Sequence, residues 1–149
     1  MVYVAEDGVY FSGLHSRALL RLFSDMTIAQ VCSLPEGVHN AKPFLNGIIF
    51  NDTKSDVLRY IDRAGDSKVF KVPSYNEEDL QFHGVDSTQI ARQAFGRGLC
   101  TVNDQVVAAG SSPSTVSLYD IRSGERIAAV NLTMDIRNAI HGLEVWPFE

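Results

Sequence analysis

The chain has 149 residues, of which 45% are hydrophobic and 21% charged, and its formal net charge is −5. This length fits one domain, and the composition is that of a globular rather than a disordered protein. The acidic balance argues against a nucleic-acid partner, because nothing supplies a basic field for phosphates. No apolar run approaches the ~20 residues of a membrane helix, and no signal-peptide pattern is present. We therefore expect a cytoplasmic protein that does not associate with membranes.

Short runs rich in Val, Ile, Leu, Phe and Tyr alternate with turn residues along almost the whole chain, which is typical of β-strands. We expect strands at 2–5, 9–12, 18–23, 28–32, 41–45, 48–50, 57–61, 68–72, 99–102, 106–109, 115–119 and 126–132, and a last apolar run at 143–146 predicts one more. Between them, Asn46-Gly47 predicts a two-residue hairpin loop, because both positions tolerate positive φ.

One stretch, residues 75–95, departs from this pattern. It is polar and contains the acidic run Asn76-Glu77-Glu78-Asp79. Asp86-Ser87-Thr88 could cap a short helix over residues 89–95. We interpret the stretch as an insertion between strands, lying outside the sheets.

An internal repeat organises the rest of the chain. The segment HNAKPFLNGIIFND at 39–52 aligns with RGLCTVNDQVVAAG at 97–110, an offset of 58 residues. Partial copies occur at 6–11 (EDGVYF) and at 141–143, where HGL echoes the RGL at 97–99. Each full copy contains a strand, a turn, a strand, a polar loop, a strand ending in Asp, a Gly turn and a last strand.

Four antiparallel strands repeated about every 40 residues are the mark of a β-propeller blade. We therefore predict an all-β fold of β-propeller-type four-stranded antiparallel blades, forming a partial propeller of about three blades. A generic β-sandwich with coincidental similarity is the alternative. The whole chain, 1–149, is then one domain or fragment with blades at approximately 1–33, 39–73 and 97–132 and the start of another at 141–149.

Three segments also resemble known propeller sequences. LYDIRSGERIAAVNL at 118–132 resembles the outer half of a blade from a WD-repeat or YVTN-type propeller. FGRGLC at 95–100 and HGLEVWPF at 141–148 are similar to segments of an uncharacterised bacterial β-propeller family, classed as a domain of unknown function. This resemblance covers roughly the last third of the chain. It implies a propeller fold and part of a longer ring, and it implies no activity.

The repeat also predicts which polar residues gather at the channel. The first strand of a propeller blade lines the central channel, so equivalent strand starts should surround one mouth of it. These positions hold His39, Arg97 and His141, with Asn40 following the first of them. Such groups could simply line a wet channel, or they could bind an anionic ligand through charge-assisted hydrogen bonds. The two His residues could also join a metal site, which would need a third ligand such as Glu144.

These residues favour a binding module over an enzyme. We predict recognition of a protein or of a small anionic ligand at the channel mouth, with no cofactor. The alternative is a propeller-type hydrolase or lyase that uses the channel-facing His and Arg side chains, with or without a metal. A complete acidic ligand set, which enzymatic propellers of the gluconolactonase kind carry on their inner strands, is missing. Catalytic residues therefore remain unassigned.

Incomplete closure of the ring predicts partners. About three blades leave two blade faces uncovered, exposing apolar side chains such as Val9, Phe11, Leu143 and Val145. We expect the chain to form a homo-oligomer, for example a six-bladed ring from two copies, or to belong to a longer propeller.

Two other residue classes have structural interpretations. We expect Asp25, Asp62 and Asp120 to hydrogen-bond backbone amides in turns. Cys32 and Cys100 fall in or beside apolar runs, so we expect small buried hydrophobic side chains rather than nucleophiles.

Overall fold

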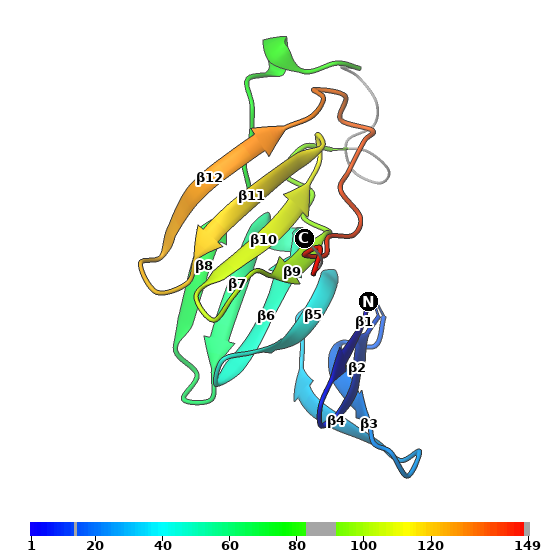
Figure 1. The fold of residues 1–149 in the computed structure, drawn as a ribbon. Coiled ribbons are helices and arrows are strands. Elements are labelled where there is room, and N and C mark those ends of the chain that lie inside the picture. Colours follow the sequence, from blue (N-terminus) through cyan, green and yellow to red (C-terminus); the bar gives the residue numbers. More distant parts are fainter. Residues whose placement is uncertain (14, 83–91, 148–149) are drawn as a thin grey trace.

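A computed structural model describes residues 1–13, 15–82 and 92–147. These residues form three four-stranded antiparallel sheets, and each sheet is a meander of strands consecutive in the sequence (Figure 1). The strands are β1 (Val2–Ala5), β2 (Gly8–Ser12), β3 (Ala18–Leu22) and β4 (Ile28–Ser33) in the first sheet; β5 (Val38–Phe44), β6 (Gly47–Asp52), β7 (Val57–Asp62) and β8 (Ser67–Lys71) in the second; and β9 (Leu99–Thr101), β10 (Val106–Ser111), β11 (Thr115–Asp120) and β12 (Glu125–Asn131) in the third.

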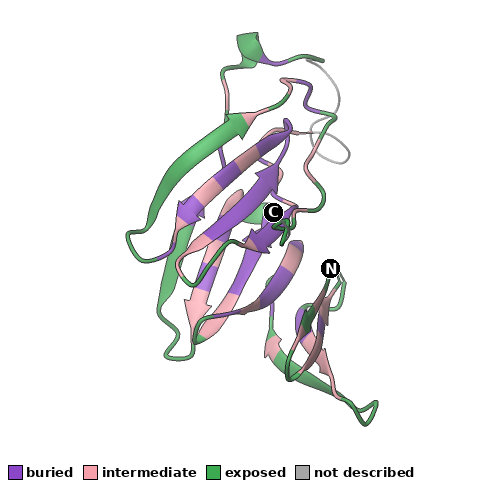
Figure 2. Ribbon diagram, viewed as in Figure 1, coloured by how far each residue is buried: buried purple, intermediate pink, exposed green. Residues whose placement is uncertain are grey.

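The twelve strands expected before residue 133 are all confirmed, with ends that differ by at most three residues. The agreement has a simple cause, since short β-branched and aromatic runs between turn residues satisfy their backbone groups only by pairing with neighbouring strands. The last strand of each sheet, β4, β8 and β12, is mostly exposed (Figure 2).

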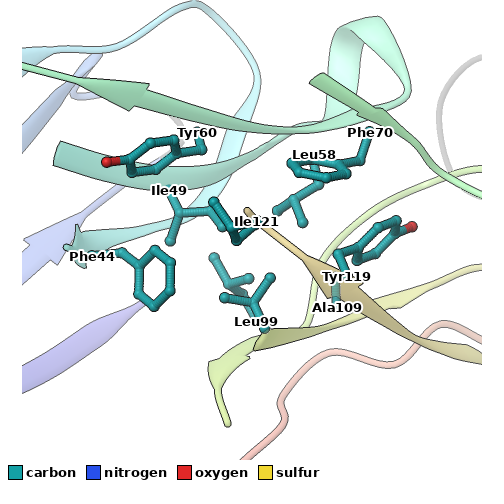
Figure 3. Close-up of a cluster of buried hydrophobic side chains, with 10 residues drawn as sticks. Phe44, Ile49, Leu58, Tyr60, Phe70, Leu99, Ala109, Tyr119 and Ile121 are labelled. Carbon is teal, nitrogen blue, oxygen red and sulfur yellow. The ribbon is translucent and has the colours of Figure 1, made fainter. Parts of the chain in front are cut away.

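Two hydrophobic cores join the sheets in series. Between the first and second sheets, Tyr10 and Leu19 pack against Val38, Ala41 and Phe50. The second and third sheets share a larger core, in which side chains from both meet (Figure 3). That core consists of Phe44, Ile49, Leu58, Tyr60, Phe70, Leu99, Val107, Ala109, Tyr119 and Ile121. Both faces of the second sheet are therefore covered by its neighbours.

The first strands of the three sheets lie on the same side of the molecule (Figure 1). Lys42 on β5 connects them. Its Nζ lies 3.4 Å from Thr101 Oγ1 on β9 and 4.3 Å from the centre of the Tyr3 ring on β1. Sheets that pack face to face with their first strands gathered on one side are the successive blades of a partial β-propeller. The predicted all-β, propeller-type fold is confirmed.

The hairpin between β5 and β6 differs from the prediction by one residue. Phe44 pairs with Gly47, so the loop is Leu45-Asn46 rather than Asn46-Gly47, and Leu45 takes the positive φ of 51°. Gly47 has a different role. A Cβ there would overlap the carbonyl oxygen of Ile61 on the neighbouring strand, so glycine is needed for close backbone approach.

The sequence repeat is also out of register in one strand. Gly47 pairs with Asp62 in the second sheet, and Val106 pairs with Asp120 in the third. Since the two Asp residues are equivalent, Gly47 corresponds to Val106, an offset of 59 rather than 58. A slip of one residue moves a side chain to the other face of a sheet, and the pairing corrects the alignment of Ile49 from Val107 to Ala108.

The predicted Asp turns are confirmed. Asp62 Oδ1 accepts hydrogen bonds from the N–H groups of residues 64 and 66, both at 2.9 Å. Asp120 Oδ1 does the same for residues 122 and 123, at 2.8 and 3.0 Å, and Asp25 Oδ1 for residue 27, at 2.9 Å. Each carboxylate closes the loop before the last strand of its sheet.

The strand predicted at 143–146 is wrong. Residues 139–147 form no regular strand, although Gly98 donates a backbone hydrogen bond to Ile140 at 2.7 Å. Ile140 also packs on the third sheet so tightly that a Cβ on Gly110 would lie 2.5 Å from the Ile140 Cβ. An apolar run becomes a strand only when another strand completes its ladder, and within the described residues nothing pairs with this one.

The insertion lies outside the sheets in its described part. It holds the three-residue 3-10 helix η2 (Glu77–Asp79) and a single bridge from Gln81 to Asp135. The helix expected over 89–95 falls partly on residues 83–91, outside the described residues, and residues 92–95 are not helical. The other helix, η1 (Thr53–Ser55), is equally short. In the described ranges, then, no helix has the length and apolarity to span a bilayer.

Candidate functional site

The predicted site residues lie at the end of the sheets where β5 and β9 begin. His39 is on β5, Arg97 lies two residues before β9, and His141 is in the irregular segment after the third sheet. None of the three is on an outer strand. The expectation that all three occupy inner strands holds for His39 alone; it is wrong for Arg97, which precedes β9, and for His141, where no strand forms.

Arg97 is the centre of the group. Its Nη1 donates a hydrogen bond of 2.8 Å to His141 Nδ1, and its guanidinium lies 4.9 Å from the centre of the Phe95 ring. The Nε atom is buried without a hydrogen-bond partner in the described residues. In that same part of the chain, no carboxylate forms an ion pair with this guanidinium. Arg97 is therefore a cation held in place by an aromatic ring and an imidazole rather than by an anion.

The hydrogen bond from Arg97 fixes the state of His141. A guanidinium only donates, so Nδ1 of His141 must accept, and the imidazole is neutral with its proton on Nε2 when this bond is made. That arrangement uses the Nδ1 lone pair that a metal would need. Consistently, no group of three or more His, Cys, Asp or Glu side chains with metal-site spacing occurs among the described residues.

His39 has the opposite tautomer. Its Nδ1 lies 3.0 Å from Thr53 Oγ1, and that hydroxyl donates its single proton to the carbonyl oxygen of Gly96 at 2.7 Å. Nδ1 of His39 must therefore carry a proton and donate it, which leaves a lone pair on Nε2 when the ring is neutral. Burial, followed by the charge of Arg97, lowers the pKa of His39 below 6.5 and favours this neutral form.

Two asparagines position the backbone around Arg97. Asn40 has φ of 54°, a left-handed conformation that asparagine tolerates, within the irregular part of β5. Its Nδ2 donates to the carbonyl oxygen of Arg97 and lies 3.5 Å from that of His141. Asn51 is fully buried and donates to the carbonyl oxygens of Arg97 and Gly98, at 3.0 and 3.2 Å. Both amides tie the second sheet to the start of the third.

A small positively charged pocket lies beside Arg97. It encloses about 80 Å³, and three arginines and one histidine contribute to its wall: Arg92, Arg97, Arg137 and His141. Arg92 is paired with Asp56, and Arg137 with Asp135 at 2.8 Å. The charge of Arg97 is thus not matched by a neighbouring carboxylate in the described wall, and the pocket carries a net positive charge.

Arg92, Phe95 and Arg137 were not predicted from the sequence. A weak signal was present, because an arginine precedes two of the three repeat starts, Arg92 five residues before Arg97 and Arg137 four residues before His141. Of the predicted set, the structure brings Asn40, Arg97 and His141 into direct contact. His39 joins them through Phe95, whose ring centre lies 5.4 Å from its own.

Glu144 takes a different place. Its carboxylate is exposed and accepts a hydrogen bond of 3.2 Å from the N–H of Val145. Its negative charge acts to raise the pKa of the Lys42 amine and of the Cys100 thiol. Lys42, which the sequence reasoning missed, is only 3% exposed, and burial lowers the pKa of its amine despite the opposing effect of Glu144.

The cysteines have the predicted character. Cys100 is buried and Cys32 half-buried, and burial raises the pKa of both thiols. A raised pKa keeps a thiol protonated at neutral pH, which suits a small apolar side chain and not a nucleophile.

Comparison with protein-family models finds no match, and no curated protein matches the chain. The resemblance to an uncharacterised bacterial family thus has no matching family model. Among solved structures, the chain is similar to selenomethionine-substituted virginiamycin B lyase from Staphylococcus aureus, with 14% identity, a TM-score of 0.44 and coverage of 80% of this chain and 40% of that one. It is also similar to a catalytically inactive histidine-to-alanine variant of that lyase with quinupristin, with 12% identity, a TM-score of 0.38 and coverage of 80% and 54%. The chain spans about half or less of those proteins.

Proposed function

We propose that the chain is a binding module that recognises a small anionic ligand at the pocket beside Arg97. The observation that supports this most directly is the guanidinium of Arg97, which has a buried Nε without a partner and no ion pair within the described residues. An arginine that has no carboxylate partner favours the binding of an anion, because charge-assisted hydrogen bonds are among the strongest that side chains make.

Each side chain has a distinct role in this proposal. Arg97 donates to the anion from a position fixed by Phe95 and His141. Arg92 and Arg137 add positive potential from the pocket wall while their own carboxylate partners keep them in place. A pocket of about 80 Å³ admits a group the size of a carboxylate or a phosphate, not a whole nucleotide.

The test is calorimetric titration of the protein with inorganic phosphate and with citrate, in wild type and in Arg97→Gln. We expect binding to wild type that weakens as salt is added. Losing a charge-assisted hydrogen bond is worth about 1.5–3 kcal/mol, so the variant should bind about 10- to 100-fold more weakly.

The matched control is Arg122→Gln, which removes an exposed arginine from the loop after β11, at the opposite end of the third sheet. It changes net charge equally and should leave binding unchanged. Equal weakening by both variants would mean that the anions respond to overall charge. Absence of binding by wild type up to about 10 mM of either anion would contradict the proposal.

A second candidate function is catalysis by a hydrolase or lyase at the same place. The observation that favours it is the neutral His39, whose Nε2 lone pair could accept a proton beside the cation of Arg97. Nitrogen-15 NMR of the imidazoles tests this directly. At pH 7 we expect His39 to be neutral with the proton on Nδ1, and a protonated ring at that pH would remove it as a base.

A further inference from the structure

The two end sheets carry apolar faces that no other sheet covers. In the first sheet, pairing places Val4 opposite Val9 and Val9 opposite Leu22, and paired residues point to the same face. This outer face consists of Val2, Val4, Val9, Phe11, Leu20 and Leu22, and Ile28 continues it on β4. Val4 is 73% exposed and Ile28 is 60% exposed. A continuous apolar face of this kind marks an interaction surface.

The third sheet has an apolar outer face of its own. Pairing places Ala108 with Leu118, and Val116 with Val130, on the side that points away from the second sheet. Ile140 covers the inner part of this face near Gly98 and Gly110. The part on β11 and β12 remains open, where Val130 is 54% exposed (Figure 2).

The internal repeat shows that the third-sheet face is built to pack on another sheet. Leu58 pairs with Phe70 in the second sheet as Val116 pairs with Val130 in the third. Leu58 and Phe70 are buried in the core against the third sheet. Val116 and Val130 therefore occupy the positions that, one blade earlier, dock onto the next sheet.

The outer face of the first sheet is complementary to the outer face of the third, because it corresponds to the side of a blade that packs on the preceding blade. Gly8 and Gly47 each follow a two-residue hairpin loop, so Phe11 occupies the position of Phe50. Phe50 is fully buried against the preceding sheet, in the core with Tyr10 and Leu19. The outer face of the first sheet thus has the pattern of a surface that receives a preceding blade, and it receives none within the described chain.

We propose that a second copy of this chain covers these faces, its third sheet docking onto the first sheet through β11 and β12. The chain carries both faces of this contact. The same two kinds of face already pack together between the first and second sheets and between the second and third. A two-fold arrangement makes the contact twice and closes a dimer. This inference does not depend on the proposed anion binding.

Sedimentation of wild type and two face variants tests the proposal. Wild type should form a species of twice the 16.4 kDa chain mass. Ile28→Glu on β4 and Val130→Glu on β12 each place a charge in the contact and should raise the dissociation constant at least about tenfold. Both side chains are more than half exposed, so the variants should fold, which circular dichroism verifies. Val69→Glu on β8, an exposed valine of the middle sheet, is the control and should associate like wild type.

A mixture of the two variants identifies the geometry. In a mixed dimer, one contact carries both substitutions and the other carries neither, so mixing should restore association. Another outcome is that Val130→Glu alone still dimerises while Ile28→Glu alone is monomeric. That result would mean that two first sheets pair with each other, which overturns the proposal. A wild type that stays monomeric up to about 100 µM overturns it too, as does association that neither substitution weakens.

Discussion

Thr53 offers a sharp test of how the site is held together. It is 3% exposed, and its hydroxyl connects His39 to the carbonyl oxygen of Gly96, at 3.0 and 2.7 Å. Thr53→Val keeps the shape of the side chain, so it opens no cavity, but it removes both hydrogen bonds. The Gly96 carbonyl then loses the hydroxyl that donates to it, and the His39 ring keeps only its backbone hydrogen bond to Gly37.

The expected loss follows from these contacts. A buried group left without its partner costs about 1–3 kcal/mol, and the second, half-buried hydrogen bond adds about 0.5–1.5 kcal/mol. We expect the free energy of unfolding to fall by about 2–3 kcal/mol, a decrease in Tm of about 5–10 °C for a domain of this size. Urea and thermal unfolding followed by circular dichroism measure both quantities.

A double-mutant cycle and a control make this prediction refutable. His39→Phe should cost less in the Thr53→Val background than in wild type, because its hydrogen bond is already gone, with a coupling of about 1 kcal/mol. Thr27→Val, which removes an exposed hydroxyl bonded to Asp25 at 2.6 Å, should change stability by less than about 0.5 kcal/mol. If Thr53→Val costs no more than this control, the hydroxyl does not hold His39, and the tautomer assigned to His39 is wrong.

Three further outcomes are expected. Since burial lowers the pKa of folded His39 below 6.5, the unfolded chain binds more protons in mild acid; stability should fall as pH drops through 6.5, and thermal unfolding of His39→Gln should show a shallower pH slope. Gly110→Val should push Ile140 off the third sheet and speed limited proteolysis of residues 139–147, with a loss of about 1–3 kcal/mol from overpacking; an unchanged cleavage rate would contradict that contact. Leu58→Ala, at a fully buried core position, should cost about 2–5 kcal/mol in urea unfolding, and a cost below about 1 kcal/mol would refute the packing of the second sheet on the third.

The strands, their order and the repeat follow from the amino-acid sequence. Local patterns decide these features, because alternating apolar runs between turn residues specify consecutive antiparallel pairing. The Asp residues at 62 and 120 could be assigned to turns for the same reason, since their partners lie two to four residues away. His39, Asn40 and Arg97 could likewise be placed at one end of the sheets, because the repeat relates their positions.

The strand register and the set of residues at the site depend on how the sheets pack. The repeat alignment shifts by one residue, so that Ile49 corresponds to Ala108 rather than Val107. This shift depends on hairpin length, which the sequence pattern does not resolve, yet it determines which face of the sheet each side chain occupies. Arg92 and Arg137 reach the pocket from outside the strands, Arg92 from the insertion and Arg137 from the segment after the third sheet. The tautomers of His39 and His141 depend on single partners brought close by packing. Contacts between residues far apart in the chain leave no local periodicity, so the sequence does not reveal them, and folding brings them together.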